Sequence, residues 1–176
     1  MSAKISVMIS EEEVAKRLVE MGEQISRDYA GKELLVVGTL RGAVYFMTEL
    51  TKRIDESIPV TIDFVSASSY GNGTTSSGDV RILKDVEESM EGKHVLVVED
   101  IVDTGQTLSR LLGYFGARNP ASLKLCALLD KPSRRVVEVP VDYVGFQIED
   151  KFVVGYGMDY AQIYRNLPYI GVVENI

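Results

Sequence analysis

The chain has 176 residues, which fits one domain that buries about 70% of the surface its unfolded chain exposes. Hydrophobic residues make up 45% and charged residues 26%, as in ordinary globular proteins, and the net charge of -7 argues against general affinity for nucleic acid or anionic membranes. No signal-peptide core and no run near the ~20 apolar residues of a membrane span occur, so we expect a soluble, cytoplasmic protein. The single cysteine, Cys126, lies in an apolar run, which predicts a buried, inert thiol.

The first predicted elements are a helix, a strand and a second helix. Ser10 and Glu13 form a capping box, and apolar residues then recur at helical spacing to about Tyr29. Leu34–Val37 predicts a short buried strand, followed by a turn and a helix over residues 44–50. Two glycines flank Arg41 in that turn, which indicates backbone that approaches an anion closely. The alternative is an ordinary strand-to-helix turn with a surface arginine.

A hairpin with a long connection follows. Residues 60–65 alternate polar and apolar side chains, which predicts a strand with one polar face, and residues 79–84 predict its partner. Between them, Ser66–Gly78 is rich in glycine, serine and threonine. A loop of this length is uncommon in a compact domain and is usually functional, so we expect a lid; a disordered surface hairpin is the alternative.

The stretch from His94 to Thr107 carries the strongest functional pattern. His94–Val98 predicts a fully buried strand, which stops at two adjacent carboxylates, Glu99 and Asp100. Ligands of parallel α/β sheets lie beyond the carboxyl ends of the strands. Successive strand residues point to opposite faces, so at least one acid must face that crevice, where it can bind hydroxyl groups or hydrated Mg²⁺.

An Asp-Thr-Gly-Gln-Thr turn, formed by residues 103–107, connects this strand to a helix. The apolar side chains from Leu108 to Phe115 recur at helical spacing. Amides at a helix N-terminus lack intrahelical partners and bind anions, so the turn predicts a phosphate site beside the paired acids. In the alternative, Asp103 merely caps the helix and the acid pair is a solvated strand end.

The C-terminal third adds a strand with a lysine at its end and an aromatic segment. Ser122–Leu129 predicts a buried strand, and Lys131 follows it at the carboxyl end, where the two anion-binding turns lie. Lysines are mostly solvated, but this placement favours a ligand role. Residues 141–146 predict a further strand. In the segment 151–160, Phe152 and Tyr156, taken singly, are more often core residues than stacking platforms.

The stretch 99–107 resembles the phosphoribosyl-pyrophosphate (PRPP) motif of the type I phosphoribosyltransferases. It has two acids, two apolar residues and then Asp-Thr-Gly-x-Thr. The resemblance runs from Leu40-Arg41-Gly42 to the segment 167–171 and is closest to the bacterial hypoxanthine-guanine branch. It implies a single α/β domain, residues 1–176, with a central, mostly parallel sheet flanked by helices, a small hood and a flexible lid hairpin. It also implies a homodimer or homotetramer.

The resemblance implies a purine-salvage enzyme that moves the 5-phosphoribosyl group of PRPP to N9 of hypoxanthine, and less well of guanine. The products are IMP or GMP and pyrophosphate, and the cofactor is Mg²⁺. The expected PRPP phosphate and ribose residues are Glu99, Asp100, Asp103, Thr104, Gly105, Gln106 and Thr107, with Asp103 also the catalytic acid-base group near purine N7. The expected pyrophosphate residues are Leu40, Arg41, Gly42 and Arg165, with a cis peptide between Leu40 and Arg41. The expected purine residues are Lys131, Phe152, Val153 and Asp159; the lid residues are Ser69 and Tyr70; the metal residues are Glu99, Asp100 and Asp159.

Three other classes of protein fit the sequence less well. No Gly-x-x-x-x-Gly-Lys-Ser/Thr occurs, which disfavours a P-loop NTPase or kinase. A phosphoacceptor receiver domain also places acids at strand ends but has no use for the anion-binding turn. A non-catalytic sensor of PRPP or nucleotide needs the turn but not the lid, Asp103, Lys131 and Phe152 together.

Overall fold

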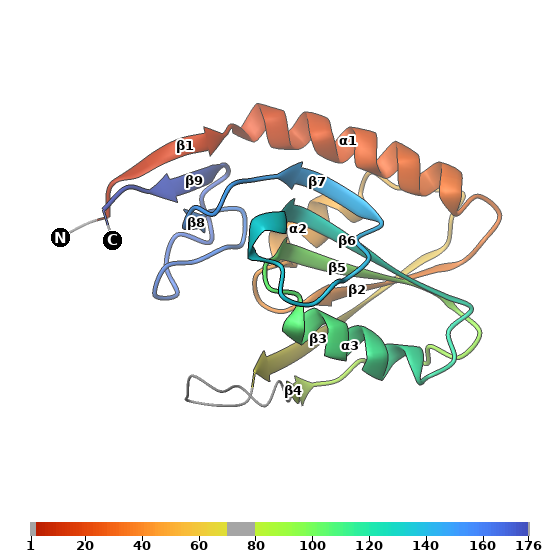
Figure 1. The fold of residues 1–176 in the computed structure, drawn as a ribbon. Helices are drawn as coiled ribbons and strands as arrows, with labels where there is room; N and C mark the ends of the chain where they lie inside the picture. The colour runs from red at the N-terminus through yellow and green to blue at the C-terminus, as the bar shows by residue number, and fades with distance from the viewer. Residues whose placement is uncertain (1–2, 70–79, 176) are drawn as a thin grey trace.

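A computed structural model describes residues 3–69 and 80–175 (Figure 1). Its main sheet has the strand order β4-β3-β2-β5-β6-β7. The strands are β2 (Leu34–Thr39), β3 (Val60–Ser69), β4 (Val80–Lys84), β5 (His94–Val102), β6 (Ser122–Asp130) and β7 (Tyr143–Gln147). The β3–β4 pair is antiparallel and the other neighbouring pairs are parallel, which confirms the expected type of sheet.

Helices cover both faces of this sheet, as Figure 1 shows. The helices are α1 (Glu11–Asp28), α2 (Val44–Thr51) and α3 (Gln106–Gly116), with the short 3₁₀ helix η1 (Pro132–Arg134) after β6. Side chains that alternate along β5 enter two cores: Leu96 and Val98 pack in the core of α1 and α2, and Val95 and Val97 in that of α3. Burial on both faces explains why the central strands are uninterrupted apolar runs. No helix in residues 3–69 and 80–175 is long and apolar enough to span a membrane.

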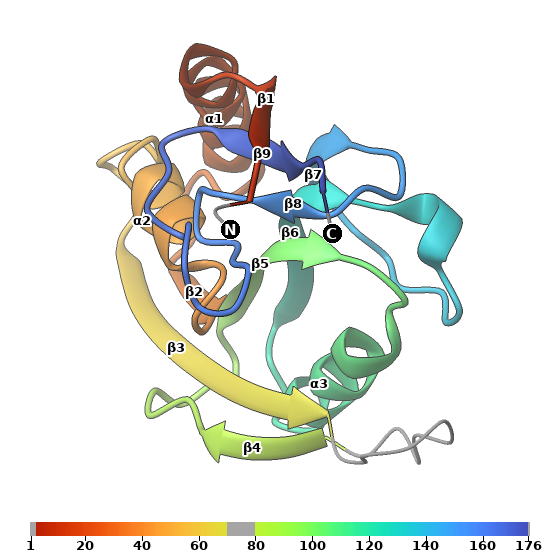
Figure 2. The ribbon, with the colours of Figure 1, turned by 90° about the vertical axis from the view of Figure 1, so that its left-hand side faces the viewer.

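A second, antiparallel sheet forms a hood. It has the order β1-β9-β8, from β1 (Ile5–Ile9), β9 (Ile170–Val173) and β8 (Val153–Val154). Figure 1 places it at the end of the molecule toward which the arrows of β3 and β7 point, and Figure 2 views that end. The hood therefore brings the C-terminal segment to the carboxyl ends of the main strands, where a parallel sheet binds ligands.

Two predicted boundaries are wrong. The central strand does not stop at Glu99: β5 continues to Val102, because β6 goes on pairing with it, as in the register Ile101 to Leu129. The long loop begins later than predicted, since β3 runs to Ser69 and pairs with Val80. Tyr70 and the rest of the segment 70–79 lie outside the described residues, so the lid stays a prediction.

Candidate active site

The paired acids lie on β5, beside the end of β2. The Glu99 carboxylate accepts hydrogen bonds from the Thr39 hydroxyl at 2.7 Å and from the Asp100 amide at 3.1 Å. Asp100 accepts one from the Ile101 amide at 2.8 Å. Burial raises the pKa of Glu99 well above the usual range of a carboxyl group, and the neighbouring Asp100 raises it further. A cation or ligand hydroxyls that face this pair would stabilise its charged form.

The predicted anion-binding turn begins α3 without a side-chain cap. Its N-cap residue is Gly105, at φ +83°, which has no side chain to cap the helix, so the alternative role of Asp103 as the cap is wrong; the Gln106 amide instead donates weakly to the Thr104 hydroxyl at 3.4 Å. A Cβ atom at Gly105 would lie 2.4 Å from the Val137 carbonyl oxygen, so both the backbone conformation and the space require glycine. Because the N-cap supplies no acceptor and the Thr104 contact is long, amides at the start of α3 can bind an anion.

One cavity joins the acids and the turn. Its volume is about 290 Å³, near the lower end of the range for small-molecule sites. The predicted residues that line it are Leu40, Gly42, Glu99, Asp100, Asp103, Thr104, Gly105, Thr107 and Arg165. The predicted residues that do not line it are Arg41, Gln106, Lys131, Phe152, Val153 and Asp159. The Leu40–Arg41 peptide bond is cis, as the resemblance implied.

The two predicted pyrophosphate arginines share one acceptor, which the sequence did not single out. The Gln162 side-chain oxygen accepts hydrogen bonds from Arg41 at 3.0 Å and from Arg165 at 3.1 Å. Asp159 forms an ion pair with Arg165 at 3.3 Å and accepts the Gln162 amide at 2.8 Å. Two guanidinium groups repel each other, so an acceptor between them stabilises their close approach.

The predicted base slot combines an exposed ring with buried neighbours. Phe152 is 44% exposed, and its ring meets that of Tyr160 edge-on at a centroid distance of 5.6 Å. Val153 lies in β8 and is buried. Lys131 is only 8% exposed, unusual for a lysine, at the end of β6. An exposed aromatic face can stack on a planar ring, and a lysine ammonium group can donate hydrogen bonds to one.

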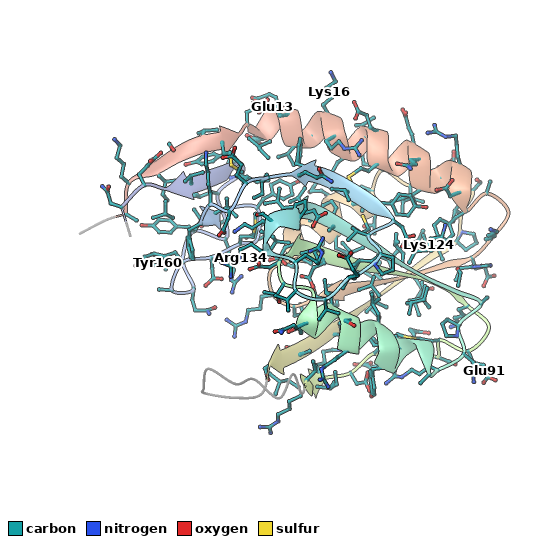
Figure 3. The ribbon with its side chains drawn as sticks, in the orientation of Figure 1. Glu13, Lys16, Glu91, Lys124, Arg134 and Tyr160 are labelled. Carbon is teal, nitrogen blue, oxygen red and sulfur yellow. The ribbon has the colours of Figure 1, made fainter. Side chains whose placement is uncertain are left out.

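Ion pairs connect Lys131 to the cavity acid Asp103 through two residues that the sequence did not single out. Arg134 contacts Asp103 at 2.9 Å and Asp150 at 3.3 Å, and Asp150 also pairs with Lys131 at 3.5 Å. Figure 3 labels Arg134 and Tyr160, which lie toward the same end of the molecule. The available signal was the position of Arg134, three residues after Lys131 in the same strand-end turn.

The predicted metal residues are not all together. Glu99 and Asp100 line the cavity, whereas Asp159 pairs with Arg165. Within residues 3–69 and 80–175, no group of three or more His, Cys, Asp or Glu side chains is arranged to hold a metal. Adjacent carboxylates fit Mg²⁺, which is usually bound through one or two carboxylates with water and substrate phosphate oxygens as the remaining ligands.

This α/β domain, with an anion-binding turn and paired acids in one cavity, belongs to the class of proteins that bind a phosphorylated ligand at the carboxyl ends of parallel strands. The family model of the phosphoribosyl transferase domain matches residues 9–161. Hypoxanthine phosphoribosyltransferase of Salmonella typhimurium is 52% identical over 175 residues, covering 98% of this chain and 97% of that protein. The Haemophilus influenzae protein of the same name is 54% identical over 172 residues, covering 96% and 95%. The chain belongs to the phosphoribosyltransferase family.

Solved structures agree in fold. A hypoxanthine-guanine phosphoribosyltransferase from Bacillus anthracis superposes with a TM-score of 0.92 at 48% identity, covering 98% of this chain and 99% of that one. A hypoxanthine phosphoribosyltransferase from Staphylococcus aureus also reaches 0.92, at 47% identity, covering 96% and 91%. The expected type I phosphoribosyltransferase fold is thereby confirmed.

Proposed function

We propose that this chain transfers the 5-phosphoribosyl group of PRPP to N9 of hypoxanthine, and less well of guanine, releasing pyrophosphate and giving IMP or GMP. The observation that carries the proposal is the single cavity that joins the acid pair, the amides of the anion-binding turn and Arg165. Relatives that match nearly the full chain and carry the name hypoxanthine phosphoribosyltransferase support the choice of base. We further propose a homodimer or homotetramer that acts in the cytoplasm.

The PRPP is proposed to lie along the cavity. Its 5'-phosphate binds the amides at the start of α3 and the hydroxyls of Thr104 and Thr107, because a helix N-terminus favours an anion. The pyrophosphate lies toward Arg165 and Arg41, and the ribose hydroxyls lie against Glu99 and Asp100. When the C1'–O bond breaks, positive charge develops on the ribose and negative charge on pyrophosphate, which the arginines stabilise.

Asp103 is proposed as the group that moves the purine proton. The N9 atom of a 6-oxopurine becomes nucleophilic when a base takes a ring proton, and Asp103 near N7 serves as that base, or as the acid in the reverse reaction. Its carboxylate lines the cavity and its side chain is 44% exposed. A bound purine can therefore reach it.

Lys131 is proposed to select the 6-oxo group. An ammonium group donates hydrogen bonds and accepts none, so it pairs with the O6 acceptor of hypoxanthine and not with the 6-amino group of adenine. The Val153 backbone is proposed to meet the adjoining edge of the base, and the Phe152 ring to stack on its face. A buried mismatch at such contacts lowers the use of the wrong base by ~10⁴ or more.

Glu99 and Asp100 are the residues proposed to hold Mg²⁺, with Asp159 near a second ion. Bound there, Mg²⁺ would supply positive charge that neutralises the pyrophosphate oxygens. The remaining ligands would be water and PRPP oxygens, which agrees with a site that offers two adjacent carboxylates.

The test is a turnover assay with PRPP, Mg²⁺ and the bases hypoxanthine, guanine, xanthine and adenine. We expect turnover with hypoxanthine, slower turnover with guanine and none with adenine. PRPP binding without turnover of any base would instead indicate a sensor of PRPP. Comparable kcat/KM values for adenine and hypoxanthine would contradict the 6-oxopurine assignment.

A further inference from the structure

Four charged side chains form a network of ion pairs along one side of the site, and two of them have no role in the proposed reaction. The ion-pair network runs from Asp103 through Arg134 and Asp150 to Lys131. Arg134 Nε lies 2.9 Å from Asp103 Oδ1, and Arg134 Nη1 lies 3.3 Å from Asp150 Oδ2. The second oxygen of Asp150, Oδ1, lies 3.5 Å from Lys131 Nζ. Arg134 and Asp150 therefore connect the two groups assigned to the purine.

The two ends of this ion-pair network, Asp103 and Lys131, are not equally exposed to water. The Lys131 side chain is 10% exposed, whereas those of Asp103, Arg134 and Asp150 are 44%, 45% and 51% exposed. An ammonium group with little access to water needs a nearby carboxylate, and Asp150 provides it. Lys131 is thus oriented by Asp150, and Asp150 in turn is fixed by the second cation, Arg134.

Hydrogen bonds to backbone carbonyl groups hold the segments that carry this ion-pair network. The Lys131 amide donates to the Val102 carbonyl at 3.0 Å, and the Arg134 amide donates to the Lys131 carbonyl at 3.1 Å. The guanidinium of Arg135 donates to the Asp103 carbonyl at 2.7 Å. The turn after β6 is therefore tied to the turn after β5 at several points, and Arg134 extends from a fixed frame.

We propose that Arg134 and Asp150 are positioning residues that set the spacing of Asp103 and Lys131, so that one 6-oxopurine contacts both at once. The inference rests on the proposed function, in which Asp103 faces N7 and Lys131 faces O6. These two atoms lie on the same edge of the purine, so a donor and an acceptor can read them together only at the correct spacing. Groups that are preorganised in this way lose less entropy when the base binds.

The alternative is that these are ordinary half-exposed ion pairs, which contribute little. Asp150→Asn and Arg134→Gln separate the two possibilities, because each removes one charge and leaves a polar side chain in its place. The matched control is Glu149→Gln. Glu149 is adjacent to Asp150 and pairs with Lys151 at 3.7 Å, but its side chain is 85% exposed and it lies outside the ion-pair network. Glu149→Gln removes a negative charge from the same surface, as Asp150→Asn does, and so is the matched control for that variant.

We expect Asp150→Asn to raise the KM for hypoxanthine roughly fivefold, and Arg134→Gln to lower kcat roughly fivefold, the upper range for half-exposed ion pairs. The KM for PRPP stays at the wild-type value, as do all parameters of Glu149→Gln. A loss that affects PRPP and hypoxanthine equally, or an equal effect of Glu149→Gln, would overturn the inference, because a merely structural role predicts either.

Double variants supply the decisive comparison. If Asp150 acts through Lys131, Asp150→Asn has no further effect on the hypoxanthine KM once Lys131 is alanine; if Arg134 acts through Asp103, Arg134→Gln has no further effect on kcat once Asp103 is asparagine. Full additivity overturns the inference while wild-type turnover of hypoxanthine leaves the proposed function intact. Absence of wild-type turnover with any 6-oxopurine overturns the proposed function, and this inference with it.

Discussion

Replacing Gly42 by alanine is expected to separate activity from stability. An ideal Cβ atom at Gly42 would lie 1.9 Å from Asp100 Oδ2, while ordinary contact begins at 3.4 Å, so the carboxylate must move by about 1.5 Å. A displacement of ~1 Å in a site can cost ~10²-fold in rate, or about 2.7 kcal/mol. We therefore expect Gly42→Ala to lower kcat/KM by about 100-fold.

The expected effect of this substitution on stability is small. Moving the Asp100 carboxylate breaks its hydrogen bond from the Ile101 amide, which costs about 1 kcal/mol. Alanine also restricts the unfolded chain more than glycine does, which stabilises the fold by ~0.4–1 kcal/mol and offsets most of that cost. For a chain of this size, the melting temperature should change by less than about 4 °C.

The assay compares kcat/KM for PRPP and hypoxanthine with the melting temperature of the same sample. Gly113→Ala is the matched control: Gly113 lies in α3, and an ideal Cβ atom there has nothing within 4 Å. It should keep wild-type activity and gain up to ~1 kcal/mol from helix propensity. Gly42→Ala activity within about threefold of wild type would refute the idea that activity depends on where the Asp100 carboxylate lies. A large fall in melting temperature would refute the expectation that only this carboxylate moves.

Other substitutions and reagents test the remaining roles. Asp103→Asn should lower kcat by ~10²- to 10⁴-fold with PRPP binding retained in a titration; turnover close to wild type would mean that another group moves the proton. Lys131→Ala should reduce the discrimination between hypoxanthine and adenine, measured as a ratio of kcat/KM values, and an unchanged ratio would remove Lys131 from base selection. Gln162→Ala should weaken pyrophosphate product inhibition roughly two- to fivefold, since the two arginines lose their shared acceptor; an identical inhibition constant would count against that role. Burial raises the pKa of the Cys126 thiol, so iodoacetamide at pH 8 should label the unfolded chain and not the native one, and rapid native labelling would contradict a buried thiol.

The sequence predicted the frame of the molecule because strong local patterns coincide with the final packing. The Ser10 capping box forms as expected, with the Glu13 amide donating to the Ser10 hydroxyl at 3.1 Å. The apolar run at the start of β5 is buried by helices on both faces. In both cases the residues that decide the structure are close together in the chain.

Features that depend on distant segments could not be predicted in the same way. The extension of β5 through Glu99 and Asp100 depends on the ladder with β6, and no local property of two acidic residues indicates it. Gln162 lies in a segment without periodicity, at φ +72°, where a side-chain bridge between two arginines leaves no sequence signal. Asp150 follows β7 and lies opposite Lys131 because β7 pairs in parallel with β6, at whose end Lys131 lies.

The extension of β5 also bears on how an acidic chain would bind a highly charged anion. With a net charge of -7, the protein gains no general attraction for PRPP, so the binding charges must be local. Because Glu99 and Asp100 lie within a strand, ladder hydrogen bonds fix their backbone. Arg165 and the start of α3 line the same cavity and supply the opposite sign. This separation of charge gives the proposed PRPP one favoured direction, with its phosphates toward α3 and the arginines and its ribose hydroxyls toward the acids.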